Sequence, residues 1–136
     1  MITYRTDLAG VNVGDLDGFF DGWPASPTPA ALLRVLTNST HVVLAVEDGK
    51  VIGLINALSD GEFAAYIPLL EVRATHRGAG IGSELVRRLL SMLGDVYMAD
   101  PICDEAVAPF YERLGLMRLT GMALRNRAAS VLSAER

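Results

Sequence analysis

Three apolar runs between residues 41 and 72 constrain the fold of this chain more than any other feature. The segment reads HVVLAVEDGKVIGLINALSDGEFAAYIPLLEV, with Asp48-Gly49 and Asp60-Gly61 between the runs. Asp-Gly between apolar runs is a strong signal for a tight reversal between antiparallel strands, so we predict a meander of three strands. Since two of these strands are almost wholly apolar, both faces of the sheet should be covered, which implies helices on each side.

Two helices are expected to cover the meander. Before it, Thr28 can cap a helix whose first position is Pro29 and whose apolar face consists of Leu32, Leu33 and Leu36. After it, residues 80–93 place apolar side chains at helical spacing, with Glu84 four residues before Arg88 on the opposite face.

Shorter elements complete the predicted order. They are a strand at 1–6, a strand at 94–102, a short helix at 103–115 and a last strand at 117–127. Pro109 must lie in the first turns of the short helix or at a kink, because it has no N–H to donate. With 136 residues, 51% of them hydrophobic, the chain is long enough for one core and short for two. We therefore expect one α/β domain spanning 1–136.

Charge and cysteine content argue against several classes of function. The net charge is −4, and the twelve Lys and Arg residues are dispersed, whereas nucleic-acid binding needs a clustered basic surface. The single cysteine, Cys103, cannot form an intramolecular disulfide, and no Cys/His cluster has metal-ligand spacing. The start of the chain lacks a leader pattern and no run is apolar enough to span a membrane, so we expect a cytoplasmic protein without a membrane partner.

A glycine-rich loop, THRGAGIG at 75–82, precedes the second helix. Glycine is costly in and beside helices, so the pattern indicates a requirement for bare backbone. The free N–H groups of such a loop and of the first helical turn converge on one spot, where the helix dipole also favours an anion. Arg77, with Arg73 as a second candidate, would add positive charge. The alternative is that these glycines only form a tight connection.

Two general nucleotide-binding motifs fit this loop poorly. A nucleoside triphosphate loop ends in lysine followed by serine or threonine, whereas here Gly82 is followed by Ser83-Glu84. A dinucleotide fingerprint needs a third glycine at the position of Ser83, and it needs its glycines directly after a strand. Asp100 lies at about the spacing expected of a ribose-binding acid, so the dinucleotide alternative stays open.

The run LLEVRATHRGAGIGSELVRRLL, residues 69–90, resembles the acetyl-coenzyme A binding segment of the GNAT N-acetyltransferase superfamily. The family signature is Gln or Arg, two residues, Gly, one residue, then Gly or Ala, and Arg77, Gly80 and Gly82 satisfy it. Downstream, APFYERLGLMRL resembles the late helix of the family and the glycine that ends it. The predicted elements follow the family order over nearly the whole chain, although Ala74 stands where proline is common.

The resemblance implies a fold and a cofactor. The fold is α/β of the α+β type, with a mixed, mostly antiparallel sheet of six to seven strands, flanking helices and a central strand pair that splays apart near Ala99. Acetyl-coenzyme A would bind there, with its pantetheine arm along the backbone of Leu70 and Val72. Its pyrophosphate would accept hydrogen bonds from the backbone of Gly78, Ala79, Gly80, Ile81, Gly82 and Ser83.

Catalytic roles follow from the chemistry of amine acetylation together with the resemblance. The departing thiolate needs an acid, and the attacking amine needs a route for its proton. Tyr111 matches the tyrosine that the family places near the coenzyme sulfur and is the candidate general acid; the alternative is an ordinary core aromatic. Asp100 is the candidate base, acting through water. Glu71 should point to the opposite strand face from Leu70 and Val72 and is expected to be structural.

Other residues receive weaker assignments. Tyr66 stands where some family members place a carboxylate, so no dedicated base is predicted on that strand. Trp23, with Phe19 and Phe20, would shape the acceptor pocket or pack in the core. Both histidines, His41 and His76, are expected at exposed loop ends.

The resulting prediction is an N-acetyltransferase that moves acetyl from acetyl-coenzyme A to a primary amine of a small molecule or a protein, and a homodimer is the expected assembly. The alternatives are a non-catalytic acyl-coenzyme A binding regulatory domain and a dinucleotide-binding module. The identity of the acceptor does not follow from these motifs.

Overall fold

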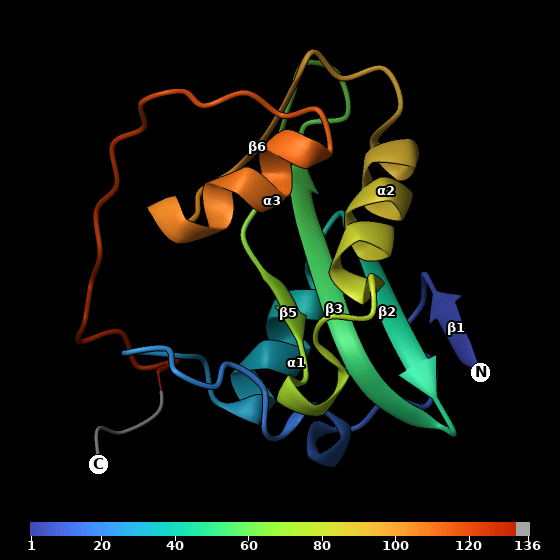
Figure 1. Cartoon of the computed structure of the whole chain (residues 1–136). Helices are drawn as coiled ribbons and strands as arrows, with labels where there is room; N and C mark the ends of the chain where they lie inside the picture. The colour runs from blue at the N-terminus through green and yellow to red at the C-terminus, as the bar shows by residue number, and fades with distance from the viewer. Residues whose placement is uncertain (133–136) are drawn as a thin grey trace.

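The predicted meander forms the centre of the structure, a computed structural model that describes residues 1–132. β2 (His41–Glu47) and β3 (Lys50–Ser59) pair antiparallel, and β1 (Ile2–Arg5) pairs with the other edge of β2. On the far side of β3, β4 (Ala64–Ile67) pairs antiparallel with β3 and parallel with β6 (Met98–Pro101). The predicted mixed, mostly antiparallel sheet is confirmed, with six strands and the order β1-β2-β3-β4-β6 (Figure 1).

The third strand of the meander is interrupted, which the sequence pattern did not predict. Both β4 and β5 (Leu70–Val72) pair with β3, through Tyr66 opposite Leu58 and Leu70 opposite Ile55. Between these pairs, two residues of β3 lie opposite the three residues 67–69. This extra residue makes a β-bulge, which bends the strand and ends its pairing with β6.

Helices α1 (Pro29–Thr37) and α2 (Ile81–Leu93) cover opposite faces of the sheet, as predicted (Figure 1). Thr28 caps α1 by accepting a hydrogen bond from the N–H of Ala31 at 3.2 Å, and Pro29 takes the first helical position. The side chains of α2 pack with one sheet face in one core cluster. The side chains of α1 pack with the other face and with the 3₁₀ helix η1 (Val13–Leu16) in a second cluster.

The short helix predicted at 103–115 consists of two pieces, η3 (Glu105–Val107) and α3 (Ala108–Arg113). Pro109 lies in the first turn of α3, where a missing N–H costs no helical hydrogen bond. A further 3₁₀ turn, η2 (Ala74–His76), leads from β5 into the glycine loop. None of the helices within the described residues is long and apolar enough to cross a membrane.

The prediction of a strand at 117–127 is wrong for the described residues. These residues form no strand; they run as an extended segment from α3 around one side of the molecule, shown in red in Figure 1. The segment returns to the body at its end, where Leu132 forms an isolated bridge with Pro27. A strand needs a neighbouring edge for its backbone groups, and none of the described strands lies beside this segment. We call residues 117–127 the C-terminal arm.

Candidate active site

The glycine loop ends at an exposed helix N-terminus. Gly78 and Gly80 both adopt φ of 81°, a left-handed conformation that favours glycine, and a side chain at either position would meet nothing within 4 Å. The first hydrogen bond of α2 runs from the N–H of Glu84 to the carbonyl of Gly80 at 3.1 Å. The N–H groups of Ile81, Gly82 and Ser83 therefore lie at the open end of the helix, ahead of that first bond. The loop geometry is that of an anion site with unobstructed access.

Gly82 has a different role from the two loop glycines. A β-carbon at this position would lie 3.5 Å from Cζ of Phe110 and 3.9 Å from Cγ2 of Val72. The first turn of α2 is thus packed closely against α3 on one side and β5 on the other. Phe110 also packs edge-on against its neighbour Tyr111, which belongs to the same core cluster as the buried residues of α2.

The backbone of β5 has one edge that pairs with none of the described strands. Leu69 accepts a hydrogen bond from the N–H of Asn56, and the N–H of Arg73 donates to Ile52, so alternate residues of β5 turn their backbone toward β3. In an antiparallel pair the residues between them turn theirs the other way. Leu70 and Val72 accordingly turn their N–H and C=O groups away from β3, where the carbonyl of Val72 accepts from Nε of Arg77. A strand edge with this orientation can hold an extended ligand.

The sheet opens where β5 begins. β4 and β6 stay paired from Ala64 opposite Met98 to Ile67 opposite Pro101, while β5 pairs with β3 alone. The splayed strand pair is therefore confirmed, but its place is corrected. Ala99 is still paired, with Ala65, and the separation begins only after Pro101, because the bulge turns β5 away from β6.

Arg77 lies at the end of β5 beside the loop. Its Nε donates to the carbonyl of Val72 at 3.1 Å, and its Nη2 donates to Oε1 of Glu71 at 3.1 Å. These contacts hold the guanidinium against β5, with nearly half of the side chain exposed.

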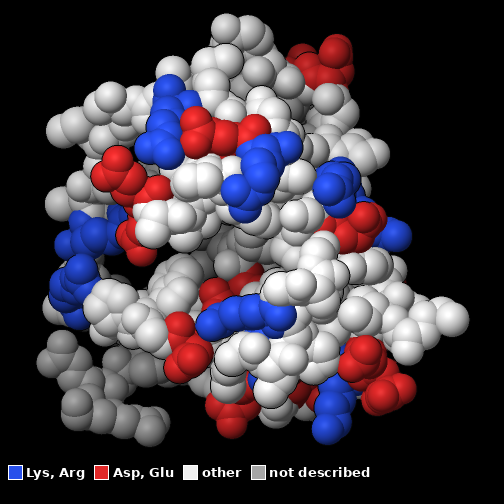
Figure 2. Space-filling model, in the orientation of Figure 1, with Lys and Arg blue, Asp and Glu red and all other residues white. Residues whose placement is uncertain are grey.

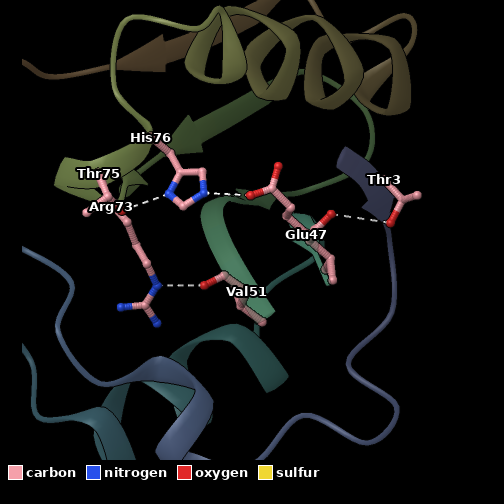
Figure 3. Close-up of polar contacts among 7 residues, drawn as sticks. Thr3, Glu47, Val51, Arg73, Thr75 and His76 are labelled. Carbon is pink, nitrogen blue, oxygen red and sulfur yellow. Dashed lines mark hydrogen bonds and ion pairs between the residues drawn. The ribbon is translucent and has the colours of Figure 1, made fainter. Parts of the chain in front are cut away.

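Arg73 does not reach the loop, which corrects its assignment as a second phosphate-binding arginine. Its Nε donates to the carbonyl of Val51 at 2.7 Å (Figure 3), and its other nitrogens donate to the carbonyls of Asp17 and Asp15. The guanidinium also lies 4.1 Å from the ring centre of Phe19. Arg73 therefore joins β3 and β5 to the η1 region, since its donors are directed at backbone carbonyls there.

His76 is partly buried rather than exposed, in contrast to the sequence expectation. Its Nε2 lies 2.9 Å from Oε1 of Glu47 on β2, and its Nδ1 lies 2.8 Å from Oγ1 of Thr75 (Figure 3). These two contacts tie η2 to the sheet immediately before the glycine loop.

Tyr111 is buried in the core cluster that contains α2, with 8% of its surface exposed. Its ring packs edge-on against Phe110 at a centroid distance of 5.0 Å. Burial, with a smaller contribution from Cys103, raises the pKa of Tyr111 to about 12. The phenol therefore keeps its proton at neutral pH, as a general acid must before it donates.

Asp100 lies on the other face of the sheet. It is exposed and stands opposite Tyr66 in the parallel pairing of β4 and β6. Ala65 and Ile67 belong to the core cluster of α2 and Tyr111, so Tyr66 and Asp100 point the opposite way. Leu58 faces Tyr66 from β3 and is also exposed, so this part of the sheet is not covered by α1.

Two hollows in the described chain lie away from these residues. One of about 300 Å³ lies between the segment after β1 and the end of α1, and one of about 470 Å³ lies beside η2. Neither is lined by Tyr111, Asp100 or the loop glycines. Residues 1–132 contain no acidic, histidine or cysteine cluster suited to a metal ion.

The model of the acetyltransferase (GNAT) family matches residues 14–116 of this chain. The chain belongs to the GNAT family of acetyltransferases. Its structure is similar to that of a protein from Deinococcus radiodurans R1 provisionally assigned as an acetyltransferase, with 57% identity and a TM-score of 0.87 over 91% of this chain and 87% of that one. It is also similar to a GNAT family acetyltransferase from Streptococcus pneumoniae TIGR4, with 27% identity and a TM-score of 0.76 over 93% and 99% of the two chains.

A curated relative is the histone acetyltransferase TAP1 of Glycine max, which is 31% identical over 120 residues. The match covers 77% of this chain and 52% of that protein, so the chain spans about half the length of this relative. Membership of the GNAT family indicates acyltransferase activity, and the family typically uses acetyl-coenzyme A. The dinucleotide alternative is wrong, because the glycine loop lies in a GNAT domain.

Two polar residues of this GNAT domain are buried, and the sequence indicated no catalytic or binding role for either of them. Glu71 is 7% exposed and, as predicted, points away from the face of Leu70 and Val72. Burial raises the pKa of Glu71, and Arg77 is the main group that opposes this shift, with smaller contributions from the Phe20 backbone and the Trp23 side chain. These contacts of Glu71 place Trp23 and Phe20 over β5, on the sheet face that α1 covers.

Asn56 is the second of these residues and holds the bulge. Its Oδ1 accepts from the N–H of Leu69 at 3.0 Å, and its Nδ2 donates to Oγ of Ser39 at 2.9 Å. It is fully buried. A lone asparagine in the otherwise apolar run VIGLINAL was the available signal, because a buried amide needs several partners.

Proposed function

We propose that this protein transfers the acetyl group of acetyl-coenzyme A to a primary amine. One observation carries the proposal: the edge of β5 that faces away from β3 runs directly to the glycine-capped N-terminus of α2, with Arg77 bound to the carbonyl of Val72 between them. An extended amide-bearing arm would bind the strand edge while a pyrophosphate binds the helix end. The residues present therefore fit the cofactor, with contacts from the backbone of Leu70, Val72 and residues 78–83.

When bound, acetyl-coenzyme A supplies a thioester whose carbonyl carbon the amine attacks directly. In this proposal Tyr111 donates its proton to the departing sulfur, since its phenol is protonated at neutral pH. Asp100 accepts the amine proton through a water molecule on the opposite face of the sheet. The acid and the base then lie on opposite sides of the opening between β5 and β6, so they do not compete for the same position beside the reacting carbonyl.

The acceptor side of this opening supports an amine with some apolar character. Leu58 and Tyr66 are exposed there in one row with Asp100 across three strands. An exposed carboxylate favours a cation, and the flanking leucine and tyrosine offer apolar contact. The proposal includes both small-molecule amines and protein amino groups; the Glycine max relative is named for a histone substrate.

The test is acetyl transfer by the full chain to a panel of amines, followed through release of the coenzyme A thiol. The panel should contain polyamines, amino sugars, lysine peptides and amines with aromatic or branched apolar groups. We expect turnover with at least one member, and a preference for amines that carry an apolar group. Binding of acetyl-coenzyme A without turnover on any amine would instead indicate a non-catalytic acyl-coenzyme A binding domain.

A further inference from the structure

The glycine loop depends on the elements at its two ends for its shape. Within the described residues, the N–H groups of Gly78, Ala79 and Gly80 donate to no backbone carbonyl. The two glycines add freedom, because glycine adopts positive and negative φ about equally well. The loop lies between the turn η2 and the helix α2. A loop without bonds of its own keeps one conformation only when both flanking elements are held in place.

The turn η2 has little internal support. The N–H of His76 donates to the carbonyl of Arg73 at 2.9 Å, but η2 has no side-chain cap at its start and contains no buried residue. A single 3₁₀ turn of three residues is not stable by itself in water. Contacts with the rest of the fold must therefore hold η2.

His76 makes the contact that joins η2 to the centre of the sheet. Its Nε2 lies 2.9 Å from Oε1 of Glu47, and a carboxylate oxygen can only accept, so Nε2 carries the hydrogen. In the neutral ring Nδ1 is then an acceptor, and the hydroxyl of Thr75 lies 2.8 Å from it as the donor (Figure 3). Both ring nitrogens have a partner, so the imidazole is fixed in one orientation.

The other end of this contact lies on a well-supported strand. Glu47 is the last residue of β2, which pairs with β1 on one edge and with β3 on the other. The side chains of His76 and Glu47 are 25% and 33% exposed. Partial burial reduces competition from water and strengthens the contact. The pair therefore connects the start of the glycine loop to the most firmly held part of the sheet.

The arginines on either side of η2 are engaged by the protein itself. Arg73 donates to carbonyls of β3 and of the η1 region, and Nε and Nη2 of Arg77 donate to Val72 and Glu71. Basic and acidic side chains are interspersed on the face shown in Figure 2, without a large basic cluster. An anion at the loop would therefore depend chiefly on backbone N–H groups, whose directions are set by the loop conformation.

We propose that His76 and Glu47 are positioning residues for the cofactor. Their contact holds η2, and η2 in turn holds the glycine loop in the conformation that receives the pyrophosphate. This inference rests on the proposed function. The pair acts before the ligand arrives, because a loop that is already ordered loses less conformational freedom on binding. Neither residue belongs to the motif of Arg77, Gly80 and Gly82.

The test compares acetyl-coenzyme A with S-acetylpantetheine, which has the same thioester and amide-bearing arm but lacks the pyrophosphate and the nucleotide. Binding titrations of the full chain measure the Kd of each ligand. The wild type should bind acetyl-coenzyme A more tightly. His76→Ala should raise the Kd of acetyl-coenzyme A by about threefold to thirtyfold and leave that of S-acetylpantetheine unchanged.

Variants of the partner separate a specific contact from a general disturbance. Glu47→Ala should have the same effect as His76→Ala, and the double variant should be no worse than either, because the shared contact is already lost. Glu47→Ala also tests the contact if His76→Ala does not fold. His76→Gln can still donate to Glu47 and should recover part of the affinity. His41→Ala, a change of the other histidine, is the matched control and should behave as the wild type.

Three results would contradict the proposal. If His76→Ala and Glu47→Ala keep the full preference for acetyl-coenzyme A, the positioning role is overturned while the proposed function stands. Equal losses of affinity for both ligands would show a general effect on the fold and would overturn the role as well. A wild type that gains no affinity from the pyrophosphate would overturn the proposed function, and this inference with it.

Discussion

Tyr66 and Asp100 stand opposite one another in the parallel pairing of β4 and β6, on the sheet face turned away from Tyr111. The two candidate proton-transfer groups, Tyr111 and Asp100, are therefore separated by the sheet itself. An amine that approaches from the face of Asp100 would meet a thioester whose sulfur lies toward Tyr111. This separation is the geometric basis for assigning one group to each half of the reaction.

Replacing Tyr111 with phenylalanine should lower turnover by about tenfold to a thousandfold, with little change in affinity for acetyl-coenzyme A, because only the proton donor is lost. Steady-state kinetics and a binding titration measure the two quantities. A melting curve of the variant at pH 7 is the control that it stays folded. Full activity of the variant would exclude Tyr111 as the acid.

The same variant gives an alkaline signature. The pKa of Tyr111 is raised from 10.0 to about 12 in the fold, so the folded chain holds this proton more tightly than the unfolded chain does. That stabilisation is present in full below pH 10 and is lost as the pH rises toward 12. Tyr111→Phe should therefore show a shallower fall in melting temperature between pH 10 and 12 than the wild type. An unchanged pH dependence would mean that the phenol ionises freely in the fold.

Asp100→Asn should lower turnover by about tenfold to a hundredfold while the KM for acetyl-coenzyme A stays the same, because the change removes a proton acceptor on the amine side. Asp95→Asn, a nearby exposed acidic residue before β6, is the matched control and should behave as the wild type. Equal effects of the two changes would indicate a general loss of negative charge and not a specific role of Asp100.

Gly80→Val should abolish most of the increase in melting temperature that acetyl-coenzyme A gives the wild type, since it fills the open loop and disturbs the helix N-terminus. Valine at a φ of 81° also costs stability, about 1–2 kcal/mol. Gly10→Val is the matched control, because Gly10 has a φ of 77°, is equally open, and belongs to another segment, between β1 and η1. If both variants respond to the cofactor as the wild type does, the loop is only a connector.

Asn56→Ala should destabilise the fold by about 1–3 kcal/mol, because the N–H of Leu69 and the hydroxyl of Ser39 lose their buried partner. Asn38→Ala removes an amide that donates to the carbonyl of Arg34 at 2.8 Å but is exposed, so a smaller loss is expected. Chemical denaturation measures both. Comparable losses would show that the bulge does not depend on the buried amide.

Glu71→Gln should leave the melting temperature at pH 7 unchanged or higher. Burial is the largest cause of the raised pKa of Glu71, so the folded chain favours its neutral form over the carboxylate. That contribution to stability is present at low pH and is lost as the pH rises through the raised pKa. Glu71→Gln should lack this loss of stability with rising pH. Glu62→Gln, a change at an exposed position, should keep it. A marked loss of stability in Glu71→Gln at pH 7 would show that the ion pair with Arg77 outweighs burial.

Local patterns in the sequence were enough for most of the elements. The Asp-Gly turns, the Thr28 cap and the apolar spacing of residues 80–93 each depend on neighbours along the chain, and the structure has the corresponding turns and helices. The motif of Arg77, Gly80 and Gly82 was likewise sufficient to indicate the family. Its residues act through the backbone conformation of a short loop, which a short stretch of sequence encodes.

The bulge and the contacts across the sheet could not be predicted from local patterns. The run AAYIPLLEV is as apolar as a continuous strand. Pro68 signals an interruption in it, but the pairing with β3 is needed to show that residues 67–69 form a bulge. His76 contacts Glu47, and Arg73 contacts the carbonyls of residues 15 and 17, across long separations in the chain. Such partners are set by which strands become neighbours.

The sequence by itself determined the order of elements, the glycine loop and the membership of the GNAT family, because each depends on spacing within a few residues. Only the tertiary structure decided where the sheet splays, which face Asp100 occupies, and that the apolar residues of the arm lack a partner in the described chain. These depend on strand pairing, and a strand-like pattern such as MRLTGMALRNR specifies that a partner is needed without specifying which one.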